Sequence, residues 1–352
     1  MDRVRLGIIG CGVIGQAHLR AAAGSQRVVI TAVADLNGEA AKKAAADLPD
    51  ARVHTRGEDL IADPSVDAVV LALPTCARHD LAMATLDAGK HLLLEKPPGM
   101  HAGELDALAA LQGDRVVACA SSRFRHYASA RAAADFLADD PLGPIRHVRF
   151  RGIGPAGPPP EKAPPVWRLS RSLNGGGILV NWGIYDLDYL LGLLQFRLQP
   201  SRVLARAWPV AADLADRAAP GSDAETHLVG LVLCHGGEAI SLERAEFAAT
   251  ARDEAWQIIG ERGALRLQMT PGEGKQLVHD HVDPARGLQS QTIWEGDQTH
   301  TTVHDGPVHD FAEAILDRRP PLTSLKQATM LQRLIDALYL SADRQGEVTL
   351  DA

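Results

Sequence analysis

The sequence lacks several features that would assign the protein to other classes. Its 352 residues contain no apolar run of 18 residues, so no membrane-spanning helix is expected. Lysine and arginine number 36 against 44 acidic residues, and they are scattered, so the basic face that nucleic acids require is missing. Aromatic residues make up only 4% of the chain, which favours a core of Ala, Val, Leu and Ile. Such a core is typical of α/β proteins with parallel strands.

Cysteine is also scarce. The four cysteines are far apart and none forms a CxxC pair: Cys11, Cys76, Cys119 and Cys234. We interpret them as reduced thiols of a cytoplasmic protein. The two close histidine pairs, at positions 279 and 281 and at 300 and 304, lack Cys or carboxylate partners at a recognised spacing. No metal site is therefore predicted.

Strands and helices are expected to alternate over the first 124 residues. Apolar segments predict strands at 4–9, 28–34, 67–73, 91–94 and 116–120, and helical segments between them include 39–48, 79–88 and 103–111. This alternation is typical of a doubly wound parallel sheet. Because the chain is long enough for two domains, we expect an N-terminal α/β Rossmann domain over 1–124.

Residues 125–352 show a different pattern. Alternating segments predict a large, mostly antiparallel open sheet, with strands at 145–153, 202–210, 226–234, 239–247, 254–259, 264–269 and 275–282. Helices are expected at 128–137, in the second half of 178–194, at 308–316 and at 325–344. We therefore expect an α+β domain for substrate binding and oligomerisation, whose C-terminal helices are free to pack back on the Rossmann domain.

Gly10, Gly12 and Gly15 form a G-x-G-x-x-G pattern between the first strand and the following helix. In this pattern the first glycine allows a tight turn, the second admits a pyrophosphate, and the third allows close packing. Val13 and Ile14 lie in the same loop, where the helix N-terminus offers free N–H groups to phosphates. The pattern alone also fits a plain strand-to-helix turn.

Asp35 favours the dinucleotide interpretation. It lies 20 residues after Gly15, at the end of the second predicted strand. A carboxylate there accepts hydrogen bonds from the ribose hydroxyls of NAD and repels a 2′-phosphate. No arginine follows at positions 36 or 37, so NAD is the expected cofactor, with NADP as the alternative.

Several ordered motifs give the chain a family resemblance. Besides the glycine loop they are Glu95-Lys96-Pro97 within 62–99, the pair at 123–124, and segments 142–145, 167–190 and 337–350. Together these resemble the Gfo/Idh/MocA oxidoreductases, the family of glucose–fructose oxidoreductase and inositol dehydrogenase, over almost the whole chain. The resemblance implies NAD(P)-dependent hydride transfer between nicotinamide and a secondary alcohol or ketone of a sugar, cyclitol or related polyol. It also implies a homodimer or homotetramer.

The resemblance assigns cofactor-side roles to individual residues. Lys96 corresponds to the family's catalytic lysine, where an ammonium stabilises the developing alkoxide and relays its proton. Pro74, Thr75 and His79 correspond to the nicotinamide-side loop, and Glu95 adjoins the cofactor. A solvated surface lysine is the alternative for Lys96, and a helix-start residue is the alternative for His79.

The segment after the glycine triplet at 175–177 departs from the common family pattern. Many members carry Asp and His four residues apart, whereas this chain has Asn181 and Tyr185. A subset of the family uses Tyr in place of His. A phenol titrates near pH 10, and a nearby ammonium lowers that value. Tyr185 and Lys96 are therefore predicted to form a proton-transfer pair, with a packing aromatic as the alternative for Tyr185.

Five further residues are candidates for placing the substrate: Arg123, Trp167, Arg168, Asn181 and Asp188. A surface salt bridge is the alternative for Arg168, and a structural role is the alternative for Asp188. Other functions on this fold are an NAD-dependent glycoside hydrolase that retains its cofactor, a trans-dihydrodiol dehydrogenase, and a non-catalytic sugar sensor. The intact Glu95-Lys96-Pro97 motif argues against a sensor, which needs no catalytic lysine.

Overall fold

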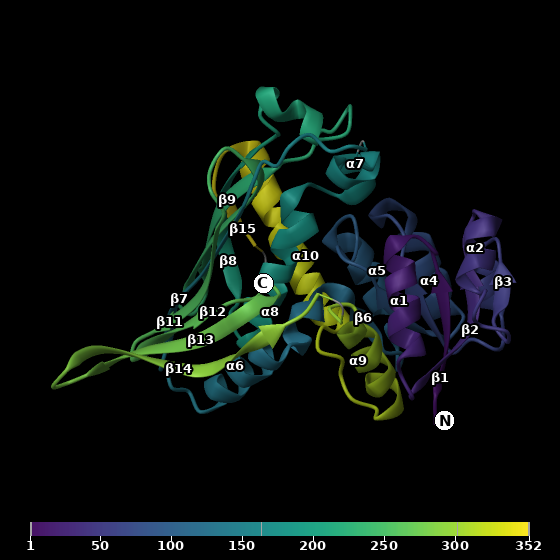
Figure 1. Cartoon of the computed structure of the whole chain (residues 1–352), viewed down its shortest axis with the longest axis horizontal. Helices are drawn as coiled ribbons and strands as arrows, with labels where there is room; N and C mark the ends of the chain where they lie inside the picture. Colours follow the sequence, from purple (N-terminus) through teal and green to yellow (C-terminus); the bar gives the residue numbers. More distant parts are fainter. Residues whose placement is uncertain (1, 163, 301, 351–352) are drawn as a thin grey trace. The chain divides into compact units, whose positions relative to one another are not determined.

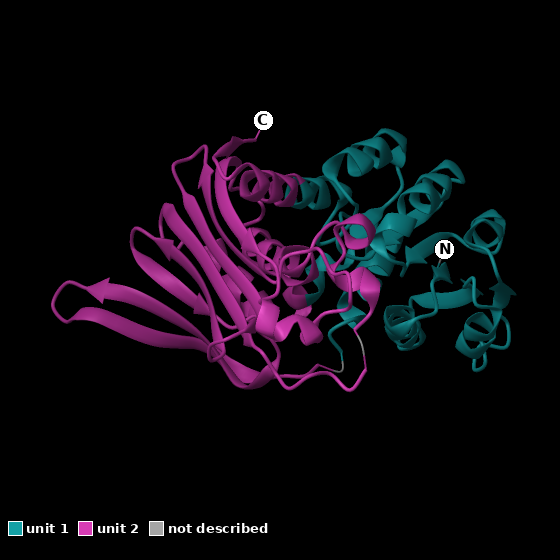
Figure 2. Ribbon diagram, turned by 90° about the horizontal axis from the view of Figure 1, so that it is seen from above, with its two compact units in different colours: residues 1–123, 301–332 teal, residues 124–300, 333–352 magenta. Residues whose placement is uncertain are grey.

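The computed structural model describes residues 2–162, 164–300 and 302–350. The chain forms two compact units, residues 1–123 with 301–332 and residues 124–300 with 333–352 (Figure 2). The first boundary lies one residue before the expected one. The second unit is not a single continuous segment, because a C-terminal stretch belongs to the first unit.

The first unit contains a six-stranded sheet in which all neighbouring strands are parallel. The strand order is β3-β2-β1-β4-β5-β6. The strands are β1 Val4–Ile9, β2 Val28–Ala34, β3 Arg52–His54, β4 Ala68–Leu71, β5 His91–Leu94 and β6 Val117–Cys119. The order reverses at β1, which has β2 on one side and β4 on the other. Ligands of such sheets bind at the carboxyl ends of the strands beside this reversal.

Helices cover both faces of this sheet because its strands are apolar on both sides. In β4, Val70 packs in the same buried cluster as helices α1 (Val13–Ala23), α2 (Gly38–Ala44) and α9 (Asp305–Leu316). Its neighbour Val69 packs on the opposite face with α3 (Gly57–Ala62), α4 (His79–Asp87) and α5 (Ala102–Gln112). Since α9 completes the first of these layers, the segment that carries it belongs to the first unit.

The second unit contains a nine-stranded sheet in the order β14-β13-β12-β11-β7-β10-β9-β8-β15. β7 (Ile145–Pro155) runs parallel to β10 (Ala239–Ala248), and every other neighbouring pair is antiparallel. The remaining strands are β8 Pro200–Trp208, β9 His227–Cys234, β11 Asp253–Gly260, β12 Gly263–Leu267, β13 Gly272–Asp283, β14 Gly287–Gln298 and β15 Val348–Thr349. This is the large, mostly antiparallel sheet that the sequence predicts.

Helices lie on one face of the nine-stranded sheet, as Figure 1 shows for α6 (Ala128–Ala138) and α8 (Ile184–Leu193). The strands alternate accordingly. Val148 and Phe150 of β7 are buried under the helices, whereas Arg149 and Arg151 point to the opposite face. The 20-residue α10 (Leu325–Arg344) contributes its first eight residues to the first unit and the rest to the second.

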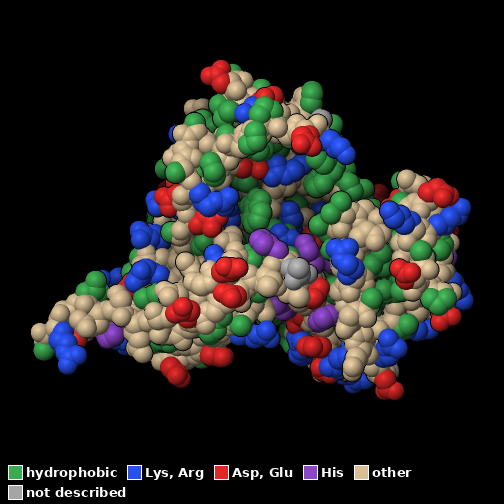
Figure 3. Space-filling view, in the orientation of Figure 1, with side chains coloured by type: hydrophobic (Ala, Val, Ile, Leu, Met, Phe, Trp, Pro, Cys, Tyr) green, Lys and Arg blue, Asp and Glu red, His purple; other side chains and the backbone are tan. Residues whose placement is uncertain are grey.

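The surface shows no segregation of charge on the face drawn in Figure 3, where basic and acidic side chains are interspersed. Among the helices in the described part of the chain, none is long and apolar enough to cross a membrane.

Candidate active site

The predicted cofactor residues of the first unit all follow the carboxyl ends of strands. Gly10 follows β1, Asp35 follows β2, Thr75 lies four residues after β4, and Lys96 lies two residues after β5. Since the carboxyl ends of parallel strands meet at one edge, these residues share the edge at which Rossmann sheets bind dinucleotides.

The three glycines have three different surroundings. Gly10 has φ +94°, and a Cβ there would lie 2.4 Å from the carbonyl oxygen of Ala72. A Cβ on Gly15 would lie 1.9 Å from the carbonyl oxygen of Gly10, so the helix and strand approach too closely for any side chain. A Cβ on Gly12 would meet nothing within 4 Å. The loop is therefore tight at its ends and open at Gly12, as a pyrophosphate requires.

The N-terminus of α1 adds donors to this opening. Gly12 is the N-cap and no side chain caps the helix. The first backbone N–H groups, including those of Val13 and Ile14, have no acceptor within the helix and favour an anion. The side chain of Val13 is 86% exposed. These residues fit the phosphates of a dinucleotide.

Asp35 is fixed by backbone donors on two segments. Its Oδ2 accepts from the Cys11 N–H at 2.7 Å, and its Oδ1 accepts from the Asn37 N–H at 2.8 Å. An ionised carboxylate has about four acceptor positions, so two remain for ribose hydroxyls. The contact to Cys11 also ties the end of β2 to the glycine loop.

Lys96 lies in a turn whose neighbouring carboxylate is buried. Glu95 Oε1 contacts His18 Nε2 of α1 at 2.9 Å, and Glu95 Oε2 accepts from the Lys96 backbone N–H at 3.0 Å. Burial acts to raise the pKa of Glu95, but the hydrogen bond and charge of His18 and the charges of Lys96 and Arg123 outweigh it and lower that pKa to about 2. The Lys96–Pro97 peptide is cis.

A fully buried arginine, Arg78, lies beside the same turn. One of its terminal nitrogens, Nη1, donates to the carbonyl oxygens of Glu95 and Pro97, and the other, Nη2, donates to Thr75 Oγ1 at 2.7 Å. Burial lowers the pKa of Arg78 to about 10, which leaves it charged at neutral pH. The structure thus joins the Lys96 turn to the loop at Thr75, which belongs to the predicted nicotinamide side.

Neither Arg78 nor His18 is among the residues predicted from the sequence. A signal for Arg78 is present in the sequence, because it directly precedes the start of α4, where a cation opposes the helix dipole. His18 follows Gly15 by three residues and is fully buried in α1. Its contact with Glu95, 77 residues away, cannot be recognised from local spacing.

Two other predicted residues of the first unit lie near these groups. His79 starts α4, next to Arg78. Arg123 is half-buried and close enough for its charge to lower the pKa of Glu95. Burial, with help from the same arginine, lowers the pKa of His304 to about 4, so this imidazole is neutral at physiological pH.

In the second unit, Tyr185 is the second residue of α8, directly after the π-helical turn η4 (Leu179–Gly183). Its side chain is fully buried. The ring contacts Phe124 edge-on at 5.2 Å between centroids and Trp182 at 6.0 Å. These contacts fix the orientation of the ring.

Asn181 links η4 to the segment that carries Trp167 and Arg168. Its Nδ2 donates to the Arg168 carbonyl oxygen at 2.9 Å, and its Oδ1 accepts from Asn174 Nδ2 at 3.1 Å. The Arg168 guanidinium forms a two-point ion pair with Glu246, at 3.0 and 2.5 Å. A surface salt bridge was the alternative interpretation of Arg168 from the sequence. The structure contains a salt bridge at this residue, and it is partly buried. Trp167 beside it is 39% exposed.

Asp188 lies inside the second unit rather than at its surface. It has no exposed area, and its Oδ1 accepts from Arg125 Nη1 at 3.2 Å. This geometry agrees with a structural role for Asp188, which was the alternative to substrate binding. Its neighbour Asp186 is equally buried and accepts from Arg244 at 2.7 and 3.1 Å and from Trp256 Nε1 at 2.7 Å.

Of the histidines considered for a metal site, His279 and His281 stack with their ring centroids 5.0 Å apart. Within residues 2–162, 164–300 and 302–350, no group of three or more His, Cys, Asp or Glu side chains is arranged to hold a metal ion.

Comparisons with known proteins agree with this geometry. Residues 4–122 match the family model described as "Oxidoreductase family, NAD-binding Rossmann fold", and residues 130–266 match the GFO/IDH/MocA C-terminal domain. The chain is 30% identical to inositol 2-dehydrogenase of Rhizobium meliloti, over 99% of both chains. The protein belongs to the Gfo/Idh/MocA oxidoreductase family. Its resemblance to that family, inferred above from the motifs, is therefore confirmed.

Other relatives of this family are similar over their whole length. A D-xylose 1-dehydrogenase (NADP(+)) of Haloferax volcanii is 26% identical over 98% of this chain and 99% of its own. The solved structure of levoglucosan dehydrogenase in complex with NADH and L-sorbose superposes with a TM-score of 0.84 at 20% identity, covering 100% of both chains. The family match and this fold confirm the predicted Rossmann domain, the NAD cofactor and the oxidoreductase class.

Proposed function

We propose that this protein is an NAD-dependent dehydrogenase that oxidises a secondary alcohol of a sugar, cyclitol or related polyol, or reduces the corresponding ketone. The observation that carries this proposal is the full-length relation to inositol 2-dehydrogenase in a chain that keeps the glycine loop, Asp35 and Lys96 at one edge of the sheet. The names of the xylose and levoglucosan dehydrogenases support the same substrate class.

Each residue has a distinct task in this proposal. Bound NAD supplies the hydride acceptor. Gly12 and the N-terminus of α1 bind the phosphates, and Asp35 binds the adenosine ribose and selects against a 2′-phosphate. Lys96 places a positive charge beside the oxygen that loses its proton, which stabilises the developing alkoxide. Lys96 of the first unit and Tyr185 of the second are the two candidates for handling the proton.

Substrate placement is assigned to the surroundings of the glycine triplet. Trp167 is the exposed aromatic of this segment, and Asn181 holds its backbone. Arg168 of the second unit and Arg123 of the first are the cationic candidates. Asp188 is buried and paired with Arg125, so its role is to support the second unit rather than to contact the substrate.

The experiment that tests this function is NADH formation at 340 nm against a panel of sugars, inositols and diols, with NAD and NADP in parallel. We expect turnover with NAD that falls about 1,000-fold in Lys96→Met, because the alkoxide loses its electrostatic stabilisation. Cofactor affinity, measured by NADH fluorescence, stays within a factor of two to three. Cofactor binding without turnover of any panel member, together with hydrolysis of a glycoside, would replace this proposal with the retained-cofactor hydrolase.

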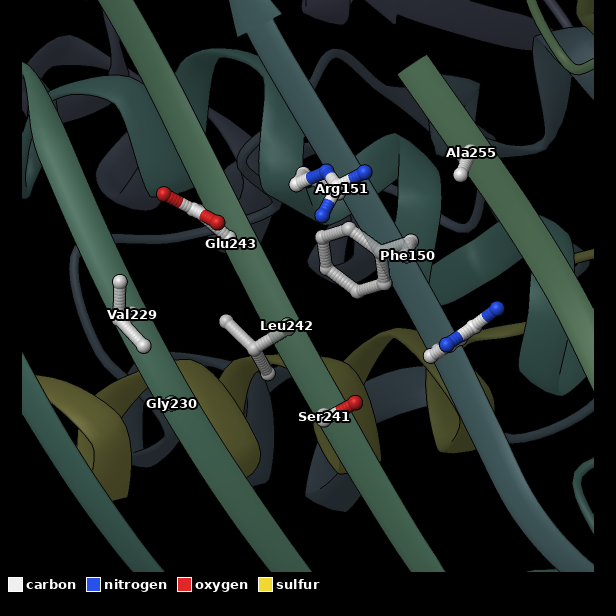
Figure 4. Close-up of a pocket in the computed structure, with 9 residues that line it drawn as sticks. Phe150, Arg151, Val229, Gly230, Ser241, Leu242, Glu243 and Ala255 are labelled. Carbon is white, nitrogen blue, oxygen red and sulfur yellow. The ribbon is translucent and has the colours of Figure 1, made fainter. Parts of the chain in front are cut away.

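We also propose that the protein is a homo-oligomer that associates through the open face of the nine-stranded sheet. This face carries a depression of about 270 Å³ lined in part by Arg151, Ser241 and Glu243 (Figure 4). Trp208 and Leu231 on β8 and β9 are 47% and 42% exposed. Apolar side chains mixed with charges of both signs suit a self-complementary interface. A monomer mass in multi-angle light scattering would contradict this assembly.

A cytoplasmic location is proposed on the basis of the thiols. All four cysteines are thiols rather than disulfides, and three of them are buried. Reduced cysteines are typical of proteins in a reducing compartment. Recovery of the protein in a periplasmic or extracellular fraction of the source cells would disprove this location.

A further inference from the structure

Arg78 holds the backbone on both sides of Lys96. Its side chain is 2% exposed, and the acceptors of its terminal nitrogens are the carbonyl oxygens of Glu95 and Pro97 and the hydroxyl of Thr75. The two carbonyls belong to the residues immediately before and after Lys96. The guanidinium therefore brackets this lysine and ties it to the neighbouring loop.

This arrangement is costly for the fold. Removing a guanidinium from water is unfavourable, and only good geometry with several acceptors offsets this penalty. Arg78 also lies at the N-cap of α4, where the helix dipole disfavours a cation. Local rules of this kind are broken mainly where a site requires it.

We propose that Arg78 is a positioning residue that keeps the Lys96 ammonium at the place where the reacting oxygen loses its proton. The inference rests on the proposed function, in which Lys96 stabilises the alkoxide. A planar guanidinium spans three acceptors in a fixed fork, whereas a lysine presents one compact ammonium. Arg78 acts on the substrate only through Lys96.

Two substitutions test whether Arg78 positions Lys96. Arg78→Met keeps the length of the side chain and removes every donor, and we expect kcat to fall about 100-fold, as a displacement of about 1 Å produces. KM for the alcohol and the dissociation constant of NADH stay within about threefold, because the cofactor is held by the glycine loop and Asp35. Arg78→Lys restores part of the lost kcat, because an ammonium reaches one or two of the three acceptors.

The chain offers a matched control in Lys90. Its buried ammonium also donates to two backbone carbonyls, those of Asp63 at 2.9 Å and Val66 at 2.5 Å. Lys90 precedes β5 and therefore lies at the opposite end of this strand from Lys96. Lys90→Met is expected to lower the melting temperature and to leave kcat within about twofold.

A double-variant cycle separates positioning from general support of the fold. If Arg78 acts through Lys96, then Arg78→Met lowers the small residual kcat of Lys96→Met by less than about threefold. A loss of similar size in both backgrounds, or an equal loss of kcat in Lys90→Met, overturns the inference. Should Arg78→Met not fold, Arg78→Lys carries the same cycle.

The cycle also distinguishes this inference from the proposed function. Normal turnover of Lys96→Met removes the assignment of Lys96 and, with it, the basis for a positioning residue. Loss of turnover in Lys96→Met with an unchanged Arg78→Met enzyme refutes only the inference.

Discussion

The two units hold the carboxylates near their predicted site residues with different donors. In the Rossmann unit, the carboxylates near the predicted cofactor accept from backbone N–H groups of loops. Asp35 accepts from Cys11 and Asn37, and Glu95 accepts from Lys96 and also contacts the side chain of His18. Each of these bonds fixes a strand-end loop from which cofactor-side groups project.

In the second unit, the carboxylates next to Tyr185 pair with arginine side chains. Asp186 is paired with Arg244, and Asp188 is paired with Arg125. Both lie on α8, and Arg244 belongs to β10, so the first pair anchors the helix to the sheet. Burial raises the pKa of Asp186, since Arg244 and Trp256 only partly offset it. Asp35 and Glu95 thus hold loops of the first unit, whereas Asp186 holds a helix of the second unit against its sheet.

Breaking the Asp186–Arg244 pair is the strongest test of this contrast. Asp186→Leu leaves a buried guanidinium unpaired, and we expect a loss of about 3–5 kcal/mol of stability, measured by urea unfolding. Adding Arg244→Met restores much of that loss, because it removes the orphaned charge. Arg27→Ala, which breaks the exposed pair with Asp317, is expected to cost far less stability, because solvent screens this pair. A similar cost for both pairs would contradict the proposed anchoring of α8.

Removing the phenol of Tyr185 sharpens the comparison, because it changes chemistry and keeps the packing. Tyr185→Phe is expected to lower kcat about 100-fold to 1,000-fold, the usual contribution of a proton-transfer group. The melting temperature changes little, since the ring contacts with Phe124 and Trp182 remain. Near-normal turnover in steady-state assays would make Tyr185 a packing residue.

The smallest effect is expected at Asp35. Asp35→Ala removes an acceptor for the ribose hydroxyls and the tie to Cys11, so the affinity for NAD falls about tenfold, which corresponds to about 1.4 kcal/mol. At saturating NAD, kcat is unchanged, and the ratio of NADP to NAD efficiency rises. Asp67→Ala, which removes the carboxylate paired with Arg5, is the control and leaves both affinities unchanged. An unchanged preference for NAD in Asp35→Ala would show that another group selects the cofactor.

Much of the fold follows from local sequence pattern. The strands at 4–9, 28–34 and 91–94 were predicted to the residue, because each is rich in apolar residues and is bounded by charged residues or Gly. β3 was missed because it has only three residues and is partly exposed at the sheet edge. β14 was missed because its 12 residues are mostly polar and it is held by pairing with β13.

The candidate site likewise has a part that local sequence predicts and a part that it does not. The sequence by itself predicts the glycine loop and Asp35 from their spacing and Lys96 from the family motif, because each lies in a short, recognisable segment. Only the tertiary structure decided the buried partners. Glu95 meets His18 77 residues away, Asp186 meets Arg244 58 residues away, and Arg78 at the start of α4 holds the carbonyls on both sides of Lys96. Such contacts depend on which segments the two sheets bring together, and no local periodicity encodes that choice.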